Sequence, residues 1–346
     1  MRANFSICLL FLTGVLFCTE SRAEIKIVAL PNIEDGIVRL RVAHAINPRL
    51  PKLDGLEIQR MLKVMEKTVL DHFQIKVLFE SPVEVDVTRL LGKIPAQVLQ
   101  YGQRDIFDFK SGTGNRRRLI NGYHKTLKLR GQDTAHLVKY TQPYLVKPVS
   151  AQTKRALAEA LVETHLARLG YWKSILALDG RSIIDETNAN EWKVWDALGY
   201  SHLPYDLIIT NQPIVSAEYS DIGVNTALRG GVTAGTTSYS KLARYNTYAM
   251  ASTFPFTEYA RLPKGTSDIK SRIQAINLAG QYSAHEIGHM LLLLGHPYGN
   301  DACVMQPEPL FNFTAWAENL DATKCKVGSS KAMKPGAAKV GFHPDW

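Results

Sequence analysis

The chain has 346 residues, of which 45% are hydrophobic and 21% charged, with 24 glycines and 16 prolines. This is the composition of a globular protein, and it excludes a collagen-like or largely disordered chain. Lys and Arg total 41 against 32 Asp and Glu, which gives a net charge of +9 and favours anionic partners without identifying one. Beyond the N-terminal segment no apolar run reaches membrane-spanning length, so we expect no stable membrane insertion.

The first 23 residues have the organisation of a secretory signal peptide. A positive start precedes the apolar run 5–17, which is too short to span a bilayer, and small residues precede a cleavage site after Ala23. A lipoprotein cysteine at Cys18 is the alternative, but the residue before it is bulkier than such sites favour. We therefore expect an exported mature chain, 24–346, that is periplasmic or secreted.

Hydrophobic periodicity predicts an α/β layer at the start of the mature chain. Alternating apolar residues predict strands at 24–31 and 75–79, and apolar residues at helical spacing predict a helix over 58–73 between them. Asp54 followed by Glu57 is typical of a capping box at the start of this helix. The expected fold class is therefore α/β (α+β).

The region from about 86 to 204 is predicted to be mostly helical. Ser150 is expected to cap a helix that ends at Gly170, and a short helix is predicted at 190–198. The basic segment 115–131 is typical of a solvated face, and no nucleic-acid reader motif accompanies it. We therefore expect no nucleic-acid partner.

The pattern then turns to β-structure and ends in a long helix. Three short strands separated by turn residues are predicted at 207–210, 231–240 and 247–254. The helix is expected to open at Ser267 or Asp268 and to end at Gly295. Its inner side is predicted to carry Ile273, Ile276, Ala279, Ile287 and Leu294.

Within this helix lies the sequence HEIGH, residues 285–289. His285 and His289 are four residues apart on one helical face, which suits two adjacent ligand positions of a tetrahedral Zn²⁺. Glu286 projects beside them and can take a proton from a metal-bound water as it attacks a carbonyl. A helix that merely carries two histidines is the alternative, but the preceding strands and a further ligand close behind favour the metal site.

A catalytic zinc needs a third protein ligand and an open fourth position. His296 follows directly after Gly295, where the chain can reverse toward the metal. Glu318 on a later helix is the alternative third ligand. The sequence CVMQP at 303–307 favours His296, because Met305 in a tight turn can form an apolar floor under the metal.

Cysteine use agrees with export. Cys8 and Cys18 leave with the signal peptide, so the mature chain keeps only Cys303 and Cys325. Two cysteines in an exported protein most simply form one disulfide.

The segment HEIGHMLLLLGH followed by CVMQP resembles the metzincin clan of zinc peptidases, and in particular the archaemetzincins. The resemblance implies a metzincin-like mixed sheet with a backing helix and an active-site helix, into which the region at about 86–204 is inserted. It also implies that the strand at 231–240 pairs with an extended substrate. The site that it implies consists of the zinc ligands His285, His289 and His296, the general base Glu286 and the Met-turn residue Met305.

The sequence departs from the family pattern at two points. HExxHxxGxxH has six positions from the second to the third histidine, whereas the step from His289 to His296 is seven, and Leu292 stands at the glycine position. The extra residue is expected to occupy one more helical position before the turn. Archaemetzincins also hold a second zinc with four cysteines. Here Pro297 replaces the first and the terminal CxxC is reduced to Cys325, so a disulfide between the two mature cysteines is inferred in its place.

The sequence therefore predicts an exported endopeptidase or aminopeptidase that uses one catalytic zinc to hydrolyse a peptide or protein substrate. A gluzincin-like peptidase with Glu318 as third ligand is one alternative, and a zinc-stabilised binding protein without turnover is another. The intact Glu286 argues against the binding protein, because a structural site has no use for that carboxylate. Tyr248 and Tyr298 are the candidates for a transition-state tyrosine.

Overall fold

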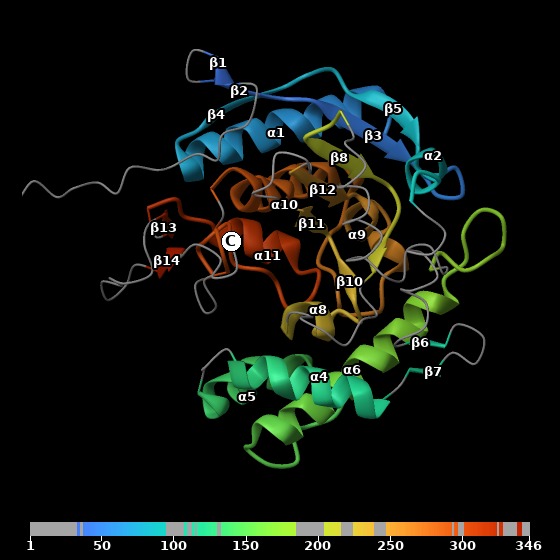
Figure 1. Cartoon of the computed structure of the whole chain (residues 1–346), viewed down its shortest axis with the longest axis vertical. Coiled ribbons are helices and arrows are strands. Elements are labelled where there is room, and N and C mark those ends of the chain that lie inside the picture. The colour runs from blue at the N-terminus through green and yellow to red at the C-terminus, as the bar shows by residue number, and fades with distance from the viewer. Residues whose placement is uncertain are drawn as a thin grey trace, which may run out of the picture.

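The computed structural model describes residues 33–34, 37–94, 107–108, 113–114, 116–129, 133–184, 204–215, 224–238, 247–292, 294–296, 301–323, 325–327 and 338–340. Within them the chain has a mixed α/β fold (Figure 1). The predicted signal peptide, the strand at 24–31 and the helix at 190–198 lie outside these residues.

The centre of the fold is a five-stranded mixed sheet in the order β11-β12-β8-β3-β5. Its strands are β3 (Val42–Ile46), β5 (Val83–Asp86), β8 (Leu207–Thr210), β11 (Gly235–Ser238) and β12 (Tyr248–Ser252). Four strands are parallel, whereas β11 is antiparallel to β12 and forms an edge of the sheet as far as the structure is described. The predicted strand at 207–210 is confirmed. The one at 247–254 is confirmed over Tyr248–Ser252, whereas Phe254 begins a short helix, and the one at 231–240 is divided into β10 (Val232–Thr233) and β11.

Among the described residues, shorter strands form four smaller sheets. The predicted strand at 75–79 is confirmed as β4 (Lys76–Phe79), which joins β1 (Ile33–Glu34) and β2 (Ile37–Leu40) in the order β1-β2-β4. The other pairs are β9 (Ile214–Val215) with β10, β6 (Phe107–Asp108) with β7 (Thr113–Gly114), and β13 (Cys325–Val327) with β14 (Ala338–Val340).

Two long helices, α1 (Gly55–Phe73) and α10 (Arg272–Leu292), pack against each other over one face of the main sheet (Figure 1). The capping box of α1 is confirmed, because the Asp54 carboxylate accepts from the Glu57 backbone and the Glu57 carboxylate accepts from the Asp54 backbone. A Cβ at Gly280 of α10 would lie 2.5 Å from a carbonyl oxygen of α1. The absence of a side chain there allows the two helices to approach closely.

Strand alternation divides the core between the two faces of the sheet. Ile209 and Ala251 face the α1–α10 layer, whereas Ile208, Tyr248 and Met250 face the opposite side, which α2 (Val87–Leu91) covers. The HEIGH segment of α10 therefore lies on the α1 side of the sheet.

The predicted start of the long helix is wrong. α10 begins at Arg272, because Asp268 is used elsewhere: its carboxylate accepts from Thr314 and Ala315 at the first turn of α11 (Phe313–Asn319). Ser267 bridges Phe311 outside any helix. Ile273 is also not on the inner side, since 54% of it is exposed. The other predicted inner residues Ile276, Ala279, Ile287 and Leu294 are buried.

The described part of 86–204 contains α4 (Arg116–Leu129), α5 (Thr134–Thr141), a 3-10 turn (Gln142–Tyr144) and α6 (Lys154–Ser174). The predicted bounds of α6 are wrong. Thr153, not Ser150, caps the helix. The helix also continues past Gly170, because Trp172 packs in the main core. Below the sheet in Figure 1, these helices contact α8 (Val224–Leu228) through α6.

Two short elements, α9 (Phe254–Thr257) and a 3-10 turn (Tyr259–Arg261), lead from β12 toward α10.

No helix within the described ranges has both the length and the apolar character that are needed to cross a bilayer.

Candidate metal centre

α10 carries three of the predicted site residues into the interior. His285, Glu286 and His289 are only 2%, 4% and 8% exposed. The helix packs between α1 on one side and strands β11 and β12 on the other. A helix placed in this way presents its histidines in an environment with little access to water.

The three predicted histidines meet through one nitrogen each. Nε2 of His285 lies 2.9 Å from Nε2 of His289 and 3.1 Å from Nε2 of His296, and the last two are 3.0 Å apart. His296 is exposed, whereas the other two are buried. These spacings are close to those of ligands on one face of a tetrahedral zinc with N–Zn bonds of about 2.0–2.1 Å.

Backbone carbonyls determine which nitrogen of each buried histidine ring carries the proton. Nδ1 of His285 lies 2.9 Å from the oxygen of Val304, and Nδ1 of His289 lies 2.5 Å from the oxygen of Leu294. Because a carbonyl only accepts, each Nδ1 must donate, which leaves the Nε2 of each neutral ring with a lone pair. Two lone pairs facing each other at 2.9 Å repel unless a cation lies between them, so the donor set fits a metal ion.

The chain between His289 and His296 differs from the expectation. The described part of α10 ends at Leu292, and Leu294 is no longer helical, so the helix does not reach Gly295 as predicted. Residue 293 lies outside the described residues, so the added helical position stays a prediction. The Leu294 backbone N–H reaches back to the oxygen of Gly288 at 3.4 Å, and the Leu294 carbonyl then accepts from His289. The Leu294 carbonyl thus orients the ring of His289.

A tight turn at 303–306 contacts His285. The Gln306 N–H donates to the oxygen of Cys303 at 2.9 Å, with Val304 and Met305 at the centre of the turn. The Val304 carbonyl holds His285, and the fully buried Met305 packs against Gly288, where a Cβ would lie 2.6 Å from its sulfur. Met305 therefore lies against the helix segment between the two buried histidines.

Glu286 is held between α10 and β11. The Thr237 hydroxyl donates to its Oε2 at 2.8 Å, and a Cβ on Gly235 would lie 2.6 Å from its Oε1. Burial raises the pKa of Glu286 to about 7, while the Thr237 hydrogen bond and the charge of Arg229 act in the opposite direction. A carboxyl group with a pKa near neutrality can both accept and release a proton.

Three residues next to the site were not predicted from the sequence. The buried ring of Tyr282 stacks on His285 with centroids 5.4 Å apart and an angle of 5°, and its position three residues earlier on the same helix was the available signal. Arg229 is 2% exposed, and its charge opposes the raised pKa of Glu286. Nothing in the sequence indicated Thr237, because its contact depends on the pairing of β11.

The remaining predicted residues do not join the histidines. Glu318 is exposed on α11, and the buried Tyr248 packs in the core on the opposite face of the sheet. Tyr298 lies outside the described residues. Cys303 is fully buried, and the side chain of Cys325 is not among those described, so their disulfide stays a prediction.

No protein-family model matches the chain, and no curated protein or solved structure matches it either. The case for a function therefore depends on the arrangement of the site.

Proposed function

We propose that the chain is an exported zinc peptidase of the metzincin kind. The observation that carries the proposal is the convergence of three imidazole nitrogens within 3.1 Å of one another beside a buried carboxylate. His285, His289 and His296 would hold the metal, and imidazole nitrogens are ligands that suit Zn²⁺. A zinc ion bound there would supply Lewis-acid polarisation of a carbonyl and of a water molecule.

Glu286 would perform the proton transfers. Its carboxylate takes the proton of the attacking water and delivers it to the leaving amine, which requires a pKa near the working pH. Thr237 anchors Oε2 at 2.8 Å, and Gly235 leaves the space that Oε1 needs. The two oxygens of Glu286 are thus held in one orientation, so proton transfer would not require this side chain to rotate first.

The substrate would bind along β11. This strand has β12 on one side and no strand partner on the other among the described residues. An extended peptide can add to such an edge through backbone hydrogen bonds. Since Gly235 at the start of β11 touches the Glu286 carboxylate, a peptide in this position would run past the base.

The deciding experiment compares Glu286→Gln with the matched change Glu318→Gln. The first change removes the base but leaves all three histidines, so the protein should keep its zinc and lose hydrolysis of a peptide library by about 10² to 10⁴. The second should change neither zinc content nor rate, because Glu318 is exposed on α11. Loss of zinc in Glu318→Gln would favour the gluzincin-like alternative. Zinc-loaded wild-type protein that cleaves no peptide would favour the zinc-stabilised binding protein.

A further inference from the structure

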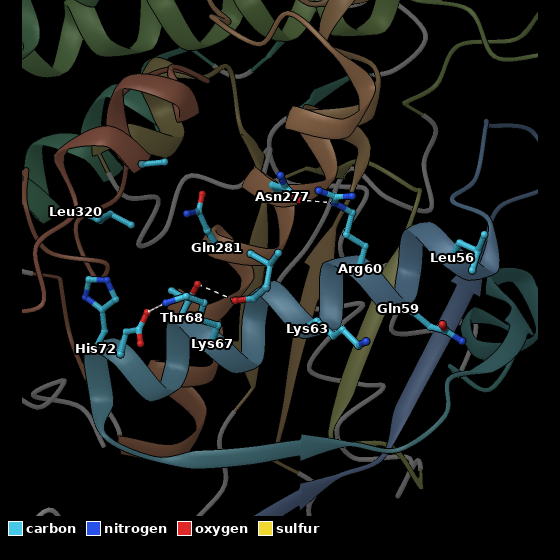
Figure 2. A pocket seen from close by; sticks show the side chains of 13 residues that line it. Leu56, Gln59, Arg60, Lys63, Lys67, Thr68, His72, Asn277, Gln281 and Leu320 are labelled. Carbon is cyan, nitrogen blue, oxygen red and sulfur yellow. Dashed lines mark hydrogen bonds and ion pairs between the residues drawn. The ribbon is translucent and has the colours of Figure 1, made fainter.

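A groove of about 740 Å³ lies between α1, α10 and the end of α11 (Figure 2). None of the three histidines of the candidate metal site lines it. α1 forms one wall along its whole length, from Leu56 to His72. Asn277 and Gln281 of α10 form the other wall, and Leu320 lies beyond α11 at one end. In Figure 2 Arg60 extends across from α1 and donates to the Oδ1 atom of Asn277 at 2.8 Å.

The α1 wall of the groove is cationic. Arg60, Lys63 and Lys67 line it and are exposed, whereas Asp71 is the single acidic residue among the lining residues and is paired with Lys67. The helix contains other acids, but they are turned away. Glu57 pairs with Arg272 at 2.8 Å, and Glu66 accepts from the backbone of β4. Charge is therefore segregated on α1, with the positive groups on the groove side.

The groove also offers apolar and amide contacts. Val64, Ala317 and Leu320 are partly buried there and can cover an apolar side chain. The buried Nδ1 of His72 has no hydrogen-bond partner among the described residues, and the Gln281 amide also lines the groove. Such groups can satisfy the backbone of a bound segment.

We propose that this groove docks an acidic peptide segment of a protein partner, with an apolar side chain placed against Leu320. Charge complementarity selects an anionic occupant, because Asp71 pairs with Lys67 and the charges of Arg60 and Lys63 remain uncompensated in the lining. The apolar contacts and the amides favour a peptide over a nucleic acid, whose phosphates would leave these groups unused. The proposal does not depend on the peptidase activity.

The test uses a fluorescein-labelled peptide of about twelve residues made of Asp, Glu and Leu, with fluorescence anisotropy as readout. All proteins carry Glu286→Gln so that the peptide remains intact. Lys63→Gln/Lys67→Gln removes two groove charges, and Lys125→Gln/Lys128→Gln removes two exposed charges from α4 as a matched control. Glutamine retains good helix propensity, so all of these proteins should fold alike.

The groove variant should bind the peptide at least tenfold more weakly, and the α4 variant should bind within twofold of the parent. Leu320→Ser should also weaken binding, since a purely ionic surface would not respond to it. Absence of binding by the parent, or an equal loss in both double variants, would overturn the proposal. Tighter binding of a DNA duplex with the same loss in the groove variant would overturn the assignment to a peptide.

Discussion

The backbone of Gly235 lies directly against the carboxylate of Glu286. A Cβ at this glycine would be 2.5 Å from Cγ and 2.6 Å from Oε1 of the glutamate. Thr237, two residues later on the same strand, donates to the other carboxylate oxygen at 2.8 Å. Strand β11 thus sets the position of the candidate base by contact at one oxygen and by a hydrogen bond at the other.

Gly235→Ala should displace the Glu286 carboxylate without touching a histidine. We expect zinc content to remain at the wild-type level and peptide hydrolysis to fall at least tenfold, because a base that has moved by a fraction of an ångström loses its alignment. Gly170→Ala is the matched control. No atom lies within 4 Å of its added methyl, and an alanine inside α6 should raise stability by about 0.5–1 kcal/mol. Unchanged hydrolysis in Gly235→Ala would show that the contact does not matter.

Gly288→Ala tests how Met305 and its turn support the proposed metal site. Its Cβ would lie 2.6 Å both from the sulfur of Met305 and from Cζ of Phe73, two side chains that are buried. We expect a loss of about 1–3 kcal/mol in unfolding free energy from overpacking. Zinc affinity should fall too, since the turn that holds His285 would shift. Thermal unfolding and metal titration measure the two effects, and a variant with wild-type values for both would contradict this role of the turn.

Local sequence signals predicted the elements whose partners lie close along the chain. The capping box of Asp54 and Glu57 is complete within four residues, and the two histidines of HEIGH share one helical face by spacing alone. The prediction that the long helix opens at Ser267 or Asp268 was wrong for the opposite reason, because the partners of Asp268 lie far along the chain. Asp268 has the properties of a helix cap, but tertiary packing presents it to α11, which lies more than forty residues later.

The contacts around the candidate site could be identified only from the folded structure. Thr237 and Gly235 meet Glu286 only because β11 is paired with β12 and packs beside α10. The end of α10 was also beyond sequence analysis. Leu294 lies outside the helix and contacts Gly288 and His289, and these contacts depend on how the chain folds back toward the helix.

The predicted pairing of Cys303 with Cys325 has a direct test. Denatured but unreduced mature protein should show no free thiol on titration. Cys325→Ser should then lower the unfolding free energy by about 3 kcal/mol, the entropic effect expected for a loop of this length. Two titratable thiols in the unreduced protein would contradict the pairing.

His165 should make stability fall at acid pH. Burial lowers its pKa from 6.5 to about 4, and the Tyr123 hydroxyl lies 2.9 Å from its Nδ1. As pH falls through 6.5 the unfolded state takes up a proton that the folded state refuses down to about pH 4. The stability present above pH 6.5 is therefore lost in this window, by about 2 kcal/mol at pH 5.

Urea unfolding at pH 7.5 and pH 5 measures this effect. His165→Gln should remove about 2 kcal/mol from the pH dependence of the unfolding free energy, and His136→Gln, on the exposed side of α5, serves as the control substitution. An identical pH dependence in wild type and His165→Gln would show that another group is responsible.

The central claim is that three histidines bind one metal ion. The most direct measurement is metal analysis of the purified mature protein beside His289→Ala and the control His136→Ala. We predict one zinc per chain in the wild type and the control, and a loss of most of it in His289→Ala, because two nitrogens cannot replace three. Wild-type protein without zinc, or His289→Ala protein with undiminished zinc, would contradict the account.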